Sequence, residues 1–354
     1  MSSSGEKKNH TYYLSLLSVI SSIAVVYLHA NGCFWKFSTE RYWLSANVIE
    51  SIFYFAVPIF FMIPGATLLN FYERYSLKEY FKKRIAKTLI PYLVFSIIGL
   101  LLKLFVVKVV PLSNLSVKYV ITGLLNGSHV SVYWFFPVLF CVYLCIPLLA
   151  AVEKEKRKAV FSYLAVACFV LNITIPYILN TFHLDFQIPY TISVGSGYLF
   201  YVIIGYLLHE YDLKGPLRIC VYALALAALI AHIVGTYFGS YAAGEVVKTF
   251  KGYTNLPCVL YSIGIFLLVK NLVNKKKEKD SLSFPEKAVR FLSSYTFSIY
   301  MIHYFLLQFM ILIMHLNYKS ILFRLLGPIP VIAISILITF VLRKIPVLRR
   351  IVPE

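Results

Sequence analysis

The chain has 354 residues, of which 60% are hydrophobic and only 14% are charged, and its formal net charge is +19. Together with a mean hydropathy of +0.76, this composition excludes a soluble globular domain. The positive charge does not call for a nucleic-acid partner, because loops of membrane proteins carry an excess of lysine and arginine that faces anionic lipid headgroups. We therefore expect an integral membrane protein.

Ten apolar stretches follow one another along the chain, each close to the roughly 20 residues that a helix needs to cross the hydrocarbon core. They predict an all-α, polytopic fold with about ten transmembrane helices. The connections are short, so residues 1–354 are expected to form a single domain. The predicted spans are 12–31, 46–69, 88–107, 132–151, 159–179, 191–208, 217–238, 254–273, 294–315 and 325–342.

Lysine and arginine are distributed unequally between the two sets of span ends. The ends on the same side as the termini carry 25 of the 34 residues, and the opposite ends carry 9. Because positive residues favour the cytoplasmic side, this bias predicts that both termini are cytoplasmic. The loops Asn31–Leu44 and Lys108–Ser131 are then expected to lie outside.

The first predicted span ends in a histidine, His29, about 27 Å along the helix axis from Tyr12. An ionisable side chain within a membrane helix is costly and indicates a functional site. A neutral imidazole is also a competent general base near neutral pH. We interpret His29 as a candidate catalytic base; the alternative is an interfacial histidine at a helix end.

Two further features lie at a depth similar to that of His29. Glu50 is a carboxylate near the outer end of the second span. It could orient an imidazole, as in other acyl-transfer sites, or it could simply reach the headgroup zone. Tyr133 and Trp134 open the fourth span from outside. They could stack against sugars, or they could belong to the aromatic belt at the membrane surface.

Lysines and arginines are concentrated on a short predicted helix before the third span. Lys83, Arg84 and Lys87 could grip the phosphates of a substrate at the cytoplasmic mouth of the bundle. The alternative is an amphipathic helix that lies on the membrane surface. The cysteines show no metal-ligand spacing, so we expect no metal.

Five segments occur in a fixed order along the chain: Ala56–Leu69, Tyr80–Leu93, Tyr133–Leu149, Gly197–Leu208 and Phe291–Leu307. In this order they resemble the acyltransferase-3 family of integral-membrane O-acyltransferases, in particular its branch that acts on bacterial surface polysaccharides. The resemblance covers nearly the whole chain. It implies ten helices, an acyl-CoA donor that binds from the cytoplasm, and a glycan acceptor on the outer side.

The same resemblance bears on individual residues. His29 matches the histidine of the family's most characteristic pair, and His303 falls where the family also tends to have a histidine. The arginine of that pair, eleven positions earlier, is replaced by Ser18, and a second arginine is replaced by Tyr54. Another residue such as Lys103 could fill the arginine role, the substrate could differ, or the chain could have lost transfer activity and move or sense a glycan instead.

The sequence thus predicts a multi-pass O-acyltransferase of the bacterial cytoplasmic membrane that moves an acyl group, expected to be acetyl, from acetyl-CoA to a hydroxyl of a cell-surface or cell-wall polysaccharide. Its partners would be the bilayer, acyl-CoA and a surface glycan, with a homodimer left open. The alternative is a glycan exporter or a non-catalytic family member. The predicted site comprises catalytic His29 and Glu50, donor-binding Lys83, Arg84 and Lys87, and acceptor-binding Tyr133, Trp134 and His303.

Overall fold

The computed structural model describes residues 3–184, 191–274 and 283–353, with side chains from Tyr12 onward. Within these residues the chain forms helices joined by turns and loops, and no strand is present. Short π-helical segments at Ile85–Leu89, Leu102–Val106 and Phe169–Thr174 continue the α-helices beside them. The α-helices are α1 (Ser3–Ala30), α2 (Arg41–Phe53), α3 (Ala56–Leu68), α4 (Leu77–Arg84), α5 (Ile90–Leu101), α6 (Val117–Asn126), α7 (Phe135–Ala150), α8 (Lys154–Cys168), α9 (Ile175–Thr181), α10 (Tyr198–Glu210), α11 (Gly215–Ala243), α12 (Leu256–Asn274), α13 (Phe284–Ser293), α14 (Thr296–Leu312), α15 (Ile321–Leu326) and α16 (Pro328–Lys344).

The predicted spans correspond to these helices in order. In the part of the chain that the structure describes, eight helices are long and apolar enough to cross a membrane, and α13 with α14, bent by 67°, gives a ninth if the pair is one span. The all-α, polytopic fold is therefore confirmed. The predicted span 191–208 differs, because α10 begins only at Tyr198 and has 13 residues, about 20 Å. Gly195 and Gly197 precede it with positive φ angles of 81° and 56°, which interrupt a regular helix.

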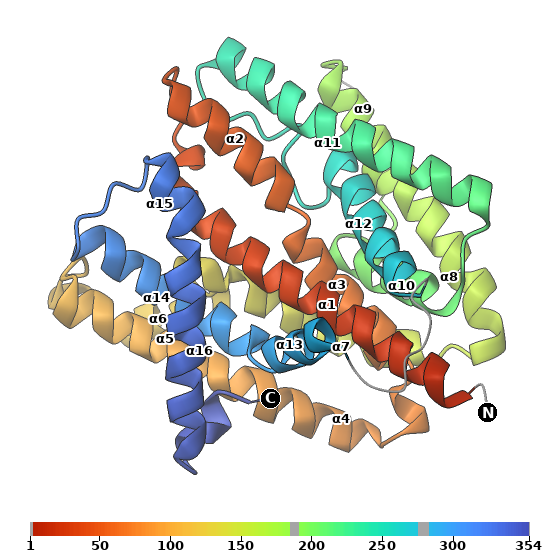
Figure 1. Cartoon of the computed structure of the whole chain (residues 1–354), viewed down its shortest axis with the longest axis horizontal. Coiled ribbons are helices and arrows are strands. Elements are labelled where there is room, and N and C mark those ends of the chain that lie inside the picture. Colours follow the sequence, from red (N-terminus) through yellow and green to blue (C-terminus); the bar gives the residue numbers. More distant parts are fainter. Residues whose placement is uncertain (1–2, 185–190, 275–282, 354) are drawn as a thin grey trace.

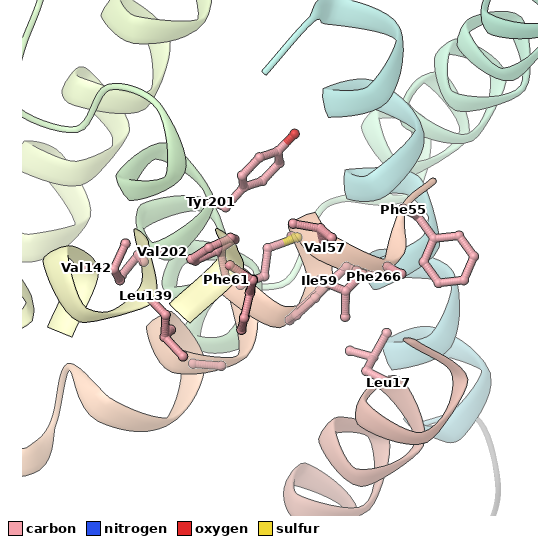
Figure 2. Close-up of a cluster of buried hydrophobic side chains, with 14 of the residues drawn as sticks. Leu17, Phe55, Val57, Ile59, Phe61, Leu139, Val142, Tyr201, Val202 and Phe266 are labelled. Carbon is pink, nitrogen blue, oxygen red and sulfur yellow. The ribbon is translucent and has the colours of Figure 1, made fainter. Parts of the chain in front are cut away.

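Helix α10 is held in the bundle by a close crossing with α3. A Cβ atom on Gly65 would lie 1.9 Å from the Val202 carbonyl oxygen, and one on Gly205 would lie 2.1 Å from that of Met62. Small residues at such crossings let two helix backbones approach closely in a membrane. Figure 2 shows the apolar core beside this crossing, where Phe61 of α3 lies close to Val202 of α10.

Helix α1 forms the centre of the arrangement. It packs against α2, α3, α12, α13, α14 and α16. In Figure 1 it runs from the N-terminus at the lower right into the middle of the molecule. Its side chains Tyr13, Leu17, Ala24 and Val25 are buried in the main core. The residue at its far end, His29, is thereby brought among segments that are distant in the sequence.

Cysteine labelling in intact cells tests the predicted orientation. We expect a membrane-impermeant maleimide to modify Thr39→Cys and Ser113→Cys in the loops predicted to be outside, and to leave Glu155→Cys unmodified until the cells are opened. All three positions are exposed, so a difference in labelling reports the side of the membrane and not burial. The exposed native Cys141 and Cys220 set the background, which the unsubstituted chain measures. Labelling of Glu155→Cys in intact cells would reverse the assignment.

Candidate active site

The structure brings two histidines together from opposite ends of the sequence. His29 ends α1 and His303 lies in the middle of α14. The Nδ1 atom of His29 is 2.8 Å from the Nε2 atom of His303. Their rings are stacked with centroids 5.0 Å apart. His303 is fully buried, and its Nδ1 atom is 3.0 Å from the backbone carbonyl oxygen of Ile299.

These contacts determine the tautomer of each neutral ring. A carbonyl oxygen can only accept, so the Nδ1 atom of His303 carries a proton and donates it to Ile299. The Nε2 atom of His303 then has a lone pair and accepts the Nδ1–H of His29. The remaining nitrogen of His29, Nε2, is left unprotonated. His29 is therefore oriented as a base by His303.

His29 opens onto a cavity of about 490 Å³, which we call the outer cavity because it lies at the end of the bundle predicted to face outside. Its walls come from the end of α1, the turn 32–35, the turn 131–134 before α7, one side of α14 and the loop before α15. The lining residues are Leu28, His29, Ala30, Gly32, Trp35, Ser131, Val132, Trp134, Tyr304, Gln308, Ile311 and Tyr318. A base next to a half-open cavity can act on a hydroxyl group that enters it.

Glu50 is buried, but it does not contact His29. Its carboxylate accepts hydrogen bonds from the side-chain amide of Asn31, at 3.1 Å, and from the indole of Trp35. Glu50 therefore does not orient the imidazole of His29 directly, because His303 is the residue that contacts its Nδ1 atom. Glu50 instead fixes the turn after α1 and with it the Trp35 wall of the outer cavity.

Of the two aromatic residues predicted to bind the acceptor, only Trp134 lines the outer cavity. Tyr133 is fully buried, and its hydroxyl donates to the carbonyl of Met301 at 2.6 Å. Tyr300 makes the reciprocal bond to the carbonyl of Val132 at 2.7 Å. These two bonds hold α14 against the turn 131–134. Tyr133 therefore supports the wall of the site and does not face the cavity. His303 is buried and does not line the outer cavity, but it contacts His29, which does.

The predicted donor-binding cations lie where α4 passes into the π-helical segment. Lys83 pairs with Glu79 at 2.9 Å. The guanidinium of Arg84 lies 5.4 Å from the ring of Tyr143 and is half-buried. Lys87 is exposed. The three cations lie at one end of the bundle.

A second cavity of about 200 Å³, the inner cavity, has lining residues that contact both this end and the middle of the bundle. Its lining includes Tyr143, whose ring lies beneath the guanidinium of Arg84. It also includes Tyr300, whose ring centroid is 5.7 Å from that of His303. Ser18 lines it too, and its hydroxyl donates to Thr296 at 3.1 Å. Ser18, where the resemblance places an arginine, thus faces a cavity with a short neutral side chain.

Two buried cations at the His29 end of the bundle were missed by the sequence reasoning, which placed them among the nine cations at the span ends opposite the termini. Lys251 donates to Asn47 and Ser51, both at 2.9 Å. Burial lowers its pKa to about 7, against the opposing effect of Glu50. Arg324 donates to Asn31 and Ser45. The available signal was the position of Arg324 within the apolar run ILFRLL of α15.

A family model described as an acyltransferase domain matches residues 11–342 of this chain. The match includes every residue that lines either cavity. No curated protein and no solved structure matches the chain.

Proposed function

The chain belongs to the acyltransferase-3 family of membrane acyltransferases, and on this premise we propose that it transfers an acyl group, acetyl in the simplest case, from coenzyme A to a hydroxyl of a surface polysaccharide. The observation that carries the proposal is the pair of contacts from His29 to His303 and from His303 to Ile299, which in two neutral rings leaves Nε2 of His29 without a proton beside the outer cavity. A glycan hydroxyl in that cavity would meet a base oriented to receive its proton.

The two substrates would approach from opposite ends. Lys83, Arg84 and Lys87 would hold the phosphates of coenzyme A at the α4 end. The arm that carries the thioester would extend along the inner cavity, past Ser18 and Tyr300, towards His29. Ser18 and His29 are eleven residues apart in α1, about 16 Å along the axis. A neutral Ser18 leaves this passage open where an arginine would extend into it.

The reaction would proceed by attack on the thioester. The acceptor oxygen bonds to the carbonyl carbon while its proton passes to Nε2 of His29. The carbon–sulfur bond then breaks, and the coenzyme A sulfur leaves and takes up that proton. The oxyanion formed between these steps needs hydrogen-bond donors. Gln308 and Ser131 line the outer cavity together with His29, and their side chains are neutral donors of the type that could bind this oxyanion.

Isotope transfer in reconstituted vesicles tests the proposal. We expect label from acetyl-CoA to appear in polysaccharide only when the chain is present. A glycan exporter would move polysaccharide without labelling it. Ser18 and Ser22 of α1 both donate to Thr296 of α14, so these two hydroxyls serve helix packing. Unlabelled glycan in vesicles that contain folded protein would contradict transferase function.

Removal of the three donor-binding charges is expected to weaken use of acetyl-CoA. A charge-assisted contact contributes about 1.5–3 kcal/mol before solvent screening reduces it. We therefore expect Lys83→Gln, Arg84→Gln and Lys87→Gln together to raise the KM for acetyl-CoA about 10- to 100-fold. The control is removal of three cations from the start of α8: Lys154, Lys156 and Lys158. An equal KM in both triple variants would mean that the α4 cluster only sets topology.

A further inference from the structure

The outer cavity is lined entirely by uncharged or imidazole side chains. In the part of the chain that the structure describes, no aspartate, glutamate, lysine or arginine lines it. Its polar groups are His29, Ser131, Gln308 and tyrosine hydroxyls, and much of the remaining wall is aromatic. Pockets of this kind bind through apolar contact, with a few hydrogen bonds that fix orientation.

Two indoles in the wall are held in place before any ligand binds. The ring of Trp134 stacks on Tyr253, with centroids 5.6 Å apart and an angle of 23°. The indole N–H of Trp35 donates a hydrogen bond to Glu50, while 46% of the surface of Trp35 stays exposed. Aromatic rings fixed in this way present flat apolar surfaces at little entropic cost.

Two buried cations near this end of the bundle make their hydrogen bonds outside the cavity. Arg324 is buried against Asn31 and Ser45. Lys251 is buried against Asn47 and Ser51. Neither lines the cavity, so neither offers a partner to an anionic group inside it. An anion that enters without such a partner loses its hydration and gains no compensating charge.

We propose that the outer cavity accepts an uncharged sugar unit of the acceptor, with its ring faces against Trp35 and Trp134, and rejects uronic acids and sugar phosphates. This inference rests on the proposed function, because it narrows the acceptor class of the same site. It concerns binding of the glycan alone and does not depend on the acyl donor.

Binding of matched oligosaccharides to the purified full-length chain, without acetyl-CoA, tests the inference. The probes are pairs that differ only at carbon 6: β-1,4-linked glucose and glucuronic acid oligomers, and α-1,4-linked galactose and galacturonic acid oligomers. We expect the neutral member of at least one pair to bind 10-fold or more tightly than its acid. Binding of no neutral oligomer, or equal or tighter binding of the acids, would overturn the inference.

Variants of the cavity wall sharpen the test. Trp134→Leu should weaken binding of the neutral oligomer about 10-fold, and Tyr163→Ala, at an exposed aromatic residue of α8, should leave it unchanged. Gln308→Arg should improve binding of the acid, because it supplies the missing cation. Failure of Gln308→Arg to favour the acid in a folded chain would count against the inference. Isotope transfer is measured separately, so a chain that binds neutral oligomers without transferring acetyl would contradict the proposed function alone.

Discussion

Replacement of His29 by alanine or glutamine is expected to lower acetyl transfer to polysaccharide by about 10²–10⁴-fold, the range for loss of a general base. In the structure His29 donates through Nδ1 to His303, so Nε2 is the atom left to accept the hydroxyl proton. Glutamine keeps a polar group of similar length but cannot take up a proton near neutral pH. Both variants should therefore lose activity to a similar extent.

The glutamine variant also separates an enzyme from an exporter, because an export path needs polarity and not basicity. The measurement is labelled acetyl in glycan per unit of membrane-inserted protein. The matched control is His183→Gln, which changes an exposed histidine outside both cavities. Near-normal transfer by His29→Gln would remove His29 from the mechanism and leave the assignment to the family match alone.

The all-α, polytopic fold and the position of His29 near the end of the first long helix could be predicted from the sequence, because both depend on local composition. About 20 apolar residues suffice to cross a membrane wherever they pack. An imidazole at the end of such a run is costly wherever it points. The start of α10 was placed too early because Gly195 and Gly197 lie in an apolar context, and their positive φ angles are not encoded in hydropathy.

The partners of His29 could not be predicted, because they depend on how helices pack. His303 lies 274 residues away in the sequence and meets His29 only because α1 and α14 are neighbours. Glu50 is at a similar depth, but its carboxylate faces Asn31 and Trp35. Depth along a helix can be read from sequence, whereas rotation about the helix axis cannot when a helix is apolar on all sides.

The same limit explains the aromatic residues at the start of the fourth span. Tyr133 and Trp134 are adjacent and equally suited to an interface, yet one is buried against Met301 and the other lines the outer cavity. Lys251 was counted as an external charge because it lies in a loop, but that loop folds into the bundle and buries it. Positive-inside counting gives the side of the membrane and does not distinguish exposed from buried cations.

The His29–His303 contact leads to the second large expected effect. His303→Leu removes the acceptor for the Nδ1–H of His29, so nothing holds the neutral imidazole of His29 in the tautomer with a free Nε2 atom. In the serine-protease triad, a substitution that leaves the histidine in the wrong tautomer lowers kcat by about 10⁴-fold. His29 keeps its ring and its place at the end of α1, so we expect a smaller loss, of about 10²–10³-fold.

The pattern of kinetic change distinguishes a positioning role for His303 from a structural one. We expect His303→Leu to lower kcat with little change in the KM for acetyl-CoA, because the α4 cations are untouched. His303→Gln should recover part of kcat, since its amide oxygen can accept the Nδ1–H of His29. Thermal unfolding of both variants in detergent measures the loss of packing separately. If glutamine rescues nothing while both variants unfold like the parent chain, then the 2.8 Å contact does not orient the base and His29 must be held by the helix end alone.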